Sequence, residues 1–246
     1  KQSILYLTLR DFPRRVANRV QTMKMAEALS NYFDVTLTVS KLHISLENIF
    51  DYYGIKKKFK IHKFGEPKFG SFTIMLLPSI LKFILIKRPN LIFIREEYPA
   101  FILSFLFKNI IYEMHDFNPE RIWIYKRIVK NSLKTIVITD ALKKKCESYK
   151  LSTKNMIILP DGVDLRLFNN NISKIEARKV LRLPLKKKLI IYSGRLSEWK
   201  GIYTLIESVK FLSNDIIVLL VGGFEGETDI LKKYLNKNNF TKKIKL

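Results

Sequence analysis

The chain has 246 residues, of which 47% are hydrophobic, and it carries a formal net charge of +23 at pH 7. This length and composition indicate a globular protein of one or two domains with a substantial core. The single cysteine, Cys146, excludes an internal disulfide, and no signal-peptide pattern opens the sequence, so we expect a cytoplasmic protein.

Short β-rich runs alternate with helical patterns in the first part of the chain. The runs predict strands at residues 4–9, 35–39, 58–64, 91–95, 110–114, 135–139 and 156–159. The first helix is predicted from apolar residues at helical spacing, namely Val20, Met23, Ala26, Leu29 and Phe33. Further helices are predicted at 72–86, interrupted early by Pro78, and at 99–107, 119–131 and 140–149. Strands and helices in this alternation predict a Rossmann-like, doubly wound parallel sheet covered on both faces.

A second α/β series follows a polar stretch at residues 169–173, which we interpret as a linker or loop. It comprises helices at 174–181, 202–212 and 228–236, strands at 189–192 and 216–221, and a last strand at the end of the sequence. We therefore predict an α/β protein with two Rossmann-like domains, residues 1–165 and residues 166–246, the second incomplete. The start at Lys1 and the basic, strand-like end suggest a fragment.

The apolar stretches and the net charge of the chain exclude few classes of function. The longest apolar stretch, residues 72–86, contains Pro78 and Lys82 and is shorter than the roughly 20 residues of a spanning helix, so we predict no membrane span. The net charge would attract nucleic acid, anionic lipid headgroups or phosphorylated substrates. The alternative is a lysine-rich, solvated surface, because the lysines come in small groups along the whole chain. Charge alone does not identify the partner.

Polar residues follow the predicted strands at their carboxyl ends, where ligands bind in parallel α/β sheets. They predict a site at this edge of each sheet. The residues are Arg10–Asp11, Arg95–Glu96, His115–Asp116, Asp161–Gly162, residues 193–201 and Gly222–Gly223.

The stretch YSGRLSEWKG, residues 192–201, is the most informative of these. Gly194 and Gly201 leave room for a ligand, and Gly201 precedes a predicted helix whose free N–H groups point into the crevice. Arg195 offers a planar fork and Lys200 a point charge, a combination that suits a diphosphate. The alternative is that Arg195 pairs with Glu198 on the surface and Lys200 is merely solvated.

Other residues at the strand ends are less specific. Gly223, with Gly222, permits either close approach to a ligand or an ordinary turn. His115 could hydrogen bond to a sugar hydroxyl, although a lone histidine is often structural. Asp161 and Asp164 are expected to fix the turn between the domains rather than bind metal.

Several sequence motifs of known catalytic and cofactor sites are absent from the sequence. It has no P-loop motif, no GxGxxG after the first strand and no GxSxG elbow, and its three histidines and one cysteine show no metal-ligand spacing. We therefore predict no bound metal and no cofactor.

Taken together, the motifs resemble a known family. LPDGVDLRLF (159–168), IIYSGRLSEWKGIYTLIESV (190–209) and VLLVGG (218–223) are similar to the retaining glycosyltransferases of family 4, which have the two-domain GT-B fold. Upstream, ANRVQTMKMAEALS (17–30), RPNLIFIREEY (88–98), IIYEMHDF (110–117) and IVITDALK (136–143) are similar to the amino-terminal domains of that family, in the same order.

The resemblance implies sugar transfer from a nucleotide-diphosphate donor to an acceptor hydroxyl, with retention of the anomeric configuration. Arg195 and Lys200 would bind the donor diphosphate without a metal ion, and Gly194, Gly201 and Gly223 would belong to the substrate-binding site. His115 falls on the active-site histidine of the family, and we expect it to orient groups by hydrogen bonding more than to act as a base.

The sequence also departs from the family. It has RDFPRRVANRV (10–20) where many members carry a glycine-rich loop after the first strand, and the acidic motif of the family, two glutamates flanking seven residues, would lie beyond residue 246. The resemblance therefore implies that the 246 residues alone are inactive or nearly so.

The expected partners are a nucleotide-sugar donor, a glycan or lipid-linked acceptor in surface polysaccharide or glycolipid synthesis, and an anionic membrane surface, but no nucleic acid. The first domain, with residues 72–86, would rest on the inner face of the cell membrane. Two alternatives stay open: a nucleotide-sugar epimerase of the same fold, and a non-catalytic nucleic-acid-binding protein.

Overall fold

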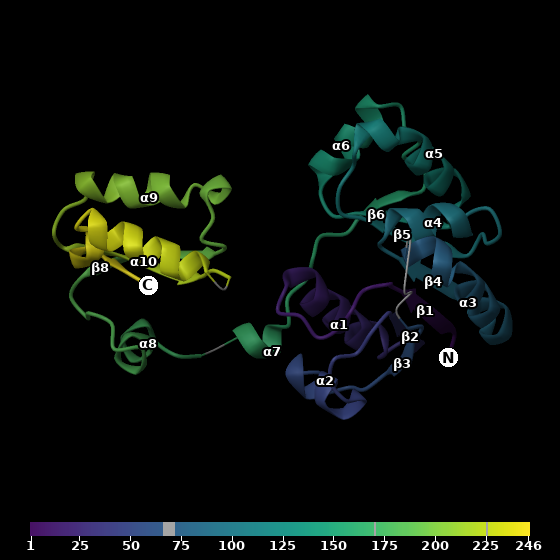
Figure 1. Cartoon of the computed structure of the whole chain (residues 1–246), viewed down its shortest axis with the longest axis horizontal. Coiled ribbons are helices and arrows are strands. Elements are labelled where there is room, and N and C mark those ends of the chain that lie inside the picture. Colours follow the sequence, from purple (N-terminus) through teal and green to yellow (C-terminus); the bar gives the residue numbers. More distant parts are fainter. Residues whose placement is uncertain (66–71, 170, 225) are drawn as a thin grey trace. The chain divides into compact units, whose positions relative to one another are not determined.

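The computed structural model describes residues 1–65, 72–169, 171–224 and 226–246. The chain divides into two compact units, Lys1–Phe168 and Asn169–Leu246 (Figure 1). The sequence analysis placed the division after residue 165. In the structure, the short helix α7 (Leu165–Phe168), which was not predicted, belongs to the first unit. The predicted linker at residues 169–173 includes residue 170, which lies outside the described residues.

The described residues of the first unit form a parallel sheet of seven strands in the order β3-β2-β1-β4-β5-β6-β7. Each strand coincides closely with a predicted strand, so the predicted α/β class is confirmed. The strands are β1 (Ser3–Leu7), β2 (Asp34–Val39), β3 (Lys60–Lys63), β4 (Leu91–Ile94), β5 (Ile110–Met114), β6 (Lys134–Val137) and β7 (Met156–Ile158).

Helices cover both faces of this sheet, because its strands are apolar on both sides. In β1, Leu5 and Leu7 join one hydrophobic cluster, whereas Ile4 and Tyr6 join the other. The first cluster lies under α3 (Phe72–Lys87), α4 (Glu97–Leu103), α5 (Ile122–Asn131) and α6 (Asp140–Ser148), and the second lies under α1 (Ala17–Leu29) and α2 (Leu46–Tyr52) (Figure 1).

Three details of the first unit differ from the sequence analysis. Helix α2 was not predicted, because it is short and buries only Ile49 and Phe50. On α1, Met23 and Ala26 are buried as predicted, but Val20 is 42% exposed and Phe33 lies beyond the end of the helix. Pro78 lies inside α3 and does not interrupt it. Proline removes one backbone hydrogen bond, but the buried Leu76, Ile80 and Ile84 around it pack the helix onto the sheet.

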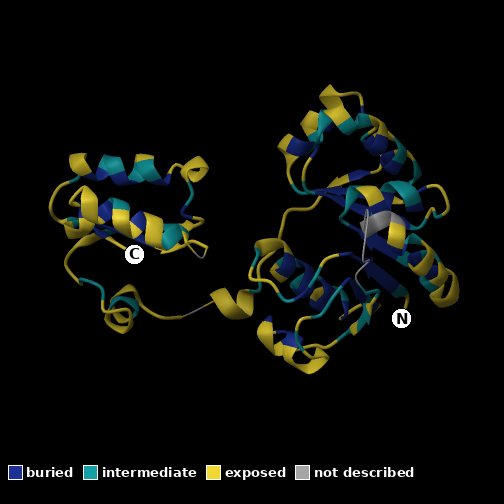
Figure 2. Ribbon diagram, viewed as in Figure 1, coloured by how far each residue is buried: buried dark blue, intermediate teal, exposed yellow. Residues whose placement is uncertain are grey.

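The described residues of the second unit contain a smaller parallel sheet with the order β10-β9-β8. Its strands are β8 (Lys188–Gly194), β9 (Ile216–Gly222) and β10 (Ile244–Lys245), and its helices are α8 (Lys174–Val180), α9 (Ile202–Ser208) and α10 (Glu227–Lys237). Val218 and Leu220 of β9 pack against α9 and α10 in a core separate from those of the first unit. Figure 2 shows buried residues inside each unit and exposed ones on the outer sides of its helices.

Among the described residues, no helix combines the length and the apolar character that crossing a bilayer requires. The longest apolar helix, α3, has 16 residues.

Candidate functional site

A cavity of about 1100 Å³ lies in the first unit, at the carboxyl ends of four strands. Its walls include Thr8 after β1, Ser40 after β2, Arg95 after β4 and His115 after β5. Strands β1 and β4 are neighbours, and the chain order runs outward from them in opposite directions. The cavity thus occupies the topological switch point of the sheet, which is where open α/β sheets bind their ligands.

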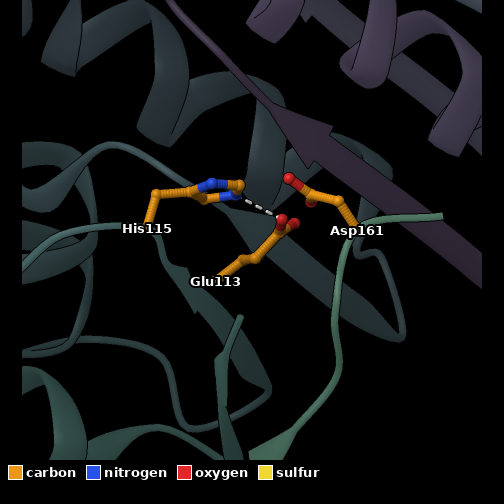
Figure 3. Close-up of side chains that lie close together, drawn as sticks. All are labelled: Glu113, His115 and Asp161. Carbon is orange, nitrogen blue, oxygen red and sulfur yellow. Dashed lines mark hydrogen bonds and ion pairs between the residues drawn. The ribbon is translucent and has the colours of Figure 1, made fainter. Parts of the chain in front are cut away.

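His115 lies in the cavity wall and contacts two charged side chains. Its Nε2 atom is 2.5 Å from Oε1 of Glu113 and 2.7 Å from Nη2 of Arg95. An Nε2 that carries a hydrogen donates to Glu113, whereas an Nε2 without one accepts from Arg95, so the tautomer of the ring decides which of the two neighbours it bonds. Glu113 is buried on β5, which fixes its carboxylate under the imidazole (Figure 3).

Asp161 brings a second carboxylate to the same place (Figure 3). It follows β7 and accepts a hydrogen bond from the side chain of Gln21 on α1. The sequence analysis assigned Asp161 to the turn between the domains. In the structure it also lies beside Glu113 and His115, which sequence spacing did not bring together.

These three residues could in principle hold a cation, because one ligand atom from each lies within 4.8 Å of the others. The guanidinium of Arg95 already lies there, with Nε 3.8 Å from the Glu113 carboxylate. A metal ion would have to share this small space with a fixed positive charge, at a high electrostatic cost. The absence of a metal ion therefore stays a prediction, with Arg95 as its physical support.

The carboxylates around the cavity are held by arginines. Asp11 accepts hydrogen bonds from Arg14 at 2.7 Å and Arg19 at 3.1 Å. Partial burial raises the pKa of Asp11, but the hydrogen bonds from Arg14, Arg19 and His43 outweigh it and lower the pKa to about 2. The segment RDFPRRVANRV (10–20) thus contributes ion pairs centred on Asp11 to the wall of the cavity.

Another ion pair lies in the wall of the cavity. Glu97 pairs with Arg121 and accepts a hydrogen bond of 2.5 Å from the hydroxyl of Tyr125. Burial, together with this carboxylate, raises the pKa of Tyr125, so the phenol remains a donor at any physiological pH.

In the second unit, Arg195 follows β8 and is fixed from three directions. It donates to Oε1 of Glu227, with Nη2 at 2.8 Å, its guanidinium lies 4.6 Å from the ring centroid of Phe224, and its carbonyl oxygen accepts from the hydroxyl of Tyr192. The partner is therefore Glu227 on α10, not Glu198. Glu227 also accepts from two backbone amides, and these contacts and Arg195 lower its pKa.

Lys200 ends a single 3-10 turn, Glu198–Lys200, directly before α9. Its Nζ atom lies 4.2 Å from the ring centroid of Trp199, and it forms no ion pair with any residue in the described part of the chain. Gly201 follows with φ of 74° and caps α9, a left-handed conformation that favours glycine. Lys200 is thus a solvated charge next to a helix start.

Glycines at the ends of β8 and β9 allow a close contact between the two backbones. The sequence analysis considered only ligand binding or an ordinary turn for Gly222 and Gly223. A Cβ on Gly222 (φ 121°) would lie 2.3 Å from the carbonyl oxygen of Gly194, and that oxygen accepts a hydrogen bond from the amide of Gly223. The ends of β8 and β9 therefore touch through their backbones, which explains the glycine pair. Whether Gly223 also touches a ligand stays a prediction.

Two functional candidates were missed from the sequence, Glu113 and Glu227. A carboxylate inside the predicted strand 110–114 was a signal for Glu113, because charged residues are rarely buried without a partner. Glu227 gave no signal, since its pairing with Arg195 depends on how α10 meets β8.

Comparisons with known proteins agree with this architecture. Residues 173–246 match the model of the family "Glycosyl transferases group 1". Over 110 residues the chain is 33% identical to TuaC of Bacillus subtilis, whose name describes it as a glycosyltransferase of teichuronic acid biosynthesis. This match covers 44% of the chain and 28% of TuaC. The matched region thus spans well under half of that relative.

Solved structures match over the whole chain. Anabaena HepE (Alr3699) with UDP and glucose has a TM-score of 0.72 at 16% identity, covering 100% of this chain and 68% of HepE. Sucrose-phosphate synthase of Thermosynechococcus elongatus has a TM-score of 0.72 at 15% identity, covering 100% of this chain and 70% of the synthase. A UDP-N-acetylglucosamine 2-epimerase matches with a TM-score of 0.57 at 11% identity, covering 100% of this chain and 68% of the epimerase.

These matches confirm the fold that the motifs implied: the chain has the fold of the GT-B glycosyltransferases, and its residues 173–246 match the family model of the group 1 glycosyl transferases.

Proposed function

We propose that this chain is part of an enzyme that transfers a sugar from a nucleotide-diphosphate donor to an acceptor hydroxyl, with retention of configuration. The observation that carries the proposal is the family match at residues 173–246, because this segment contains both Arg195 and Lys200. The pathway we propose is surface polysaccharide or glycolipid synthesis, which agrees with the teichuronic acid role in the name of TuaC.

The donor diphosphate is assigned to Arg195 and Lys200. Glu227 and Phe224 hold the guanidinium of Arg195 in one orientation, so little conformational entropy is lost when it binds a phosphate. Lys200, which has no carboxylate partner in the described part of the chain, adds a second positive charge. Together the two cations stabilise the negative charge that grows on the leaving diphosphate.

The acceptor is assigned to the cavity of the first unit. Its polar walls offer hydrogen-bond partners to hydroxyl groups, and His115 contributes a ring nitrogen whose position is set by Glu113 and Arg95. We propose that His115 orients the reacting groups by hydrogen bonding. The proposal places the enzyme in the cytoplasm, peripherally at the inner face of the cell membrane, without a metal or other cofactor.

Direct binding of nucleoside diphosphates tests the proposal. Isothermal titration of the chain with UDP, GDP and ADP is expected to show binding of at least one of them. The double variant Arg195→Ala, Lys200→Ala should weaken this binding by about tenfold for each cation removed. The matched control Lys232→Ala, Lys233→Ala removes two exposed lysines of the same unit and should leave affinity unchanged.

Equal affinity in the two double variants, or no binding of any of the three nucleotides, would contradict the proposal. Conversion of a nucleotide sugar in the absence of any acceptor would instead support the epimerase alternative, and tight, salt-sensitive binding of duplex nucleic acid would support the other alternative.

A further inference from the structure

Helices α4 and α5, with the turn that follows α4, present an exposed apolar surface beside the cavity. Phe105 is 54% exposed, Leu106 62% and Trp123 58%. The ring of Phe101 joins them, with its centroid 5.2 Å from that of Phe105 and 5.0 Å from that of Trp123. We call Phe101, Phe105, Leu106 and Trp123 the α4–α5 patch. A contiguous aromatic surface of this kind marks an interaction site more often than scattered apolar residues do.

The chain around the α4–α5 patch is positively charged. Residues 98–112 and 121–139, which include α5 and most of α4, contain no aspartate or glutamate. The basic residues of these two segments are Lys108, Arg121, Lys126, Arg127, Lys130 and Lys134. Arg127 lies over the ring of Phe105, with its guanidinium 3.9 Å from the ring centroid, so charge and aromatic surface are interleaved. The patch therefore complements a surface that carries negative charges on its outside and has an apolar layer beneath them.

Most acidic residues of the same region lie at the cavity. Glu96, Glu97 and Asp116 line it, and Glu113 is buried beneath His115. Glu120 is exposed and lies just before Arg121, outside the two basic segments. The helical side and the cavity edge thus differ in charge, although they are formed by the same stretch of chain. An acidic protein surface would match the lysines, but it would not match exposed phenylalanine, leucine and tryptophan. An anionic bilayer matches both.

The patch adjoins the cavity through two residues that line it, Tyr98 and Arg121. Their side chains contact each other, with the guanidinium of Arg121 5.3 Å from the ring centroid of Tyr98. Arg121 lies directly before α5, and Trp123 is the second residue of that helix. Tyr98 and Phe101 both lie on α4, three residues apart. A molecule anchored in a bilayer under the patch would therefore lie close to the mouth of the cavity.

We propose that the α4–α5 patch docks on an anionic bilayer surface, and that the acceptor entering the adjoining cavity is anchored in that bilayer. The sequence analysis expected residues 72–86 to make such a contact. In the structure, Leu76, Ile80 and Ile84 of that segment face the core, whereas Met75, Leu85 and Ile86 are exposed, so a contact by this segment stays a prediction. The side chains of residues 72–74 lie outside the described ones. The acceptor class rests on the proposed function, whereas bilayer docking does not depend on it.

Tryptophan fluorescence tests the docking, and one of its two variants, Trp199→Phe, leaves the patch unaltered. The chain has two tryptophans, Trp123 in the first unit and Trp199 in the second. Variant Trp199→Phe leaves Trp123 as the reporter, and Trp123→Phe leaves Trp199. With vesicles of phosphatidylglycerol and phosphatidylcholine in equal parts, emission of Trp123 should shift to the blue and be quenched by brominated lipid. Emission of Trp199 should change little. A change at Trp199 alone, or at neither, overturns the proposal.

Charge reversal supplies an independent test with a matched control. Lys126→Glu, Lys130→Glu reverses two lysines of α5, and Lys232→Glu, Lys233→Glu reverses two exposed lysines of α10, so the net charge falls equally in both. Cosedimentation with the same vesicles should weaken by about tenfold or more in the first variant and clearly less in the second. Equal weakening would mean that only the overall charge attracts the protein, and it would contradict docking through the patch.

Two measurements separate this proposal from others. Sedimentation velocity without vesicles should show no self-association; association that disappears in Phe105→Ser, Leu106→Ser would assign the patch to a second copy of the chain and overturn the proposal. UDP titration of Lys126→Glu, Lys130→Glu should match the unaltered chain, so that loss of docking is distinguishable from loss of the donor site.

Discussion

Single carboxylates organise several basic groups in this chain, because it has 45 lysines and arginines but only 22 acidic residues. Asp11 contacts Arg14, Arg19 and His43, and Glu227 holds Arg195 together with two backbone amides. Removal of such a carboxylate leaves more than one hydrogen-bond donor without its partner. Substitution of an acidic residue should therefore have larger effects here than substitution of one of its basic partners.

Asp11→Asn tests this at the cavity. We expect the free energy of unfolding to fall by about 1–2 kcal/mol at pH 7, because the amide cannot replace the charge that faces two arginines. The pKa of Asp11 is lowered from 3.8 to about 2 in the folded chain. Its stabilisation is therefore complete above pH 4 and is lost as the pH falls from about 4 to about 2.

Urea denaturation between pH 7 and pH 3 measures the effect. The difference between Asp11→Asn and the unaltered chain should shrink toward pH 3. The control Asp51→Asn changes an exposed aspartate of α2 and should have little effect at any pH. A difference for Asp11→Asn that stays constant over this range would show that the ion pairs are not its cause.

Gly222→Ala tests the backbone contact between β8 and β9. The new Cβ would lie 2.3 Å from the carbonyl oxygen of Gly194, and φ of 121° is itself unfavourable for alanine. We expect the second unit to lose about 2–4 kcal/mol of stability. Gly226→Ala is the control: its φ of 86° is also positive, but a Cβ there has no neighbour within 4 Å. It should cost only about 1 kcal/mol. Equal losses would argue against the contact.

At the scale of elements, α1 connects the cavity to the end of the first unit. Glu27 on α1 is buried and accepts from the backbone amides of Lys56 and Lys57, and it pairs with Arg166 at 3.1 Å. Lys24, one turn earlier, pairs with Asp164 at 3.1 Å. Burial raises the pKa of Glu27, but the two amides and the nearby cations lower it overall. Residues 161–168 are thus fixed to α1 by charge.

Glu27→Ala should release this segment. We expect a loss of about 3 kcal/mol in the stability of the first unit, because buried amides and cations lose their partner. Trypsin should then cleave more rapidly after Arg166. The control Glu47→Ala removes an exposed glutamate of α2 and should change neither property. Unchanged cleavage after Arg166 in Glu27→Ala, despite lower stability, would show that charge does not fix the segment.

The sequence predicted these elements well where their apolar pattern was long and failed where tertiary contacts decide. The strands around Leu5 and Phe93 are apolar on both faces, so they could be identified as buried parallel strands. Helix α7 could not be predicted, because its four residues bury no side chain. The site followed the same rule: His115 and Arg195 were found at strand ends, but their partners Glu113 and Glu227 depend on packing.

At the scale of the whole molecule, the two units have separate cores. The clusters around Leu7 and Leu37 belong to the first unit, and the cluster around Val218 belongs to the second. The second core is smaller, and small cores are less stable. We therefore expect two unfolding transitions on heating, the first of them in the second unit. Fluorescence distinguishes them, with Trp123→Phe reporting the second unit and Trp199→Phe the first.

The division into units also predicts which unit a bound nucleotide stabilises. Arg195 and Lys200 both belong to the second unit, so the bound nucleoside diphosphate should stabilise that unit, by about 2.7 kcal/mol at a concentration 100 times the dissociation constant. The transition reported by Trp199 should therefore rise in temperature, whereas that reported by Trp123 should not. Arg195→Ala, Lys200→Ala should abolish the rise without abolishing the transition. A nucleotide that raises only the transition of the first unit would place its binding site in the cavity beside His115, and the donor assignment would be wrong.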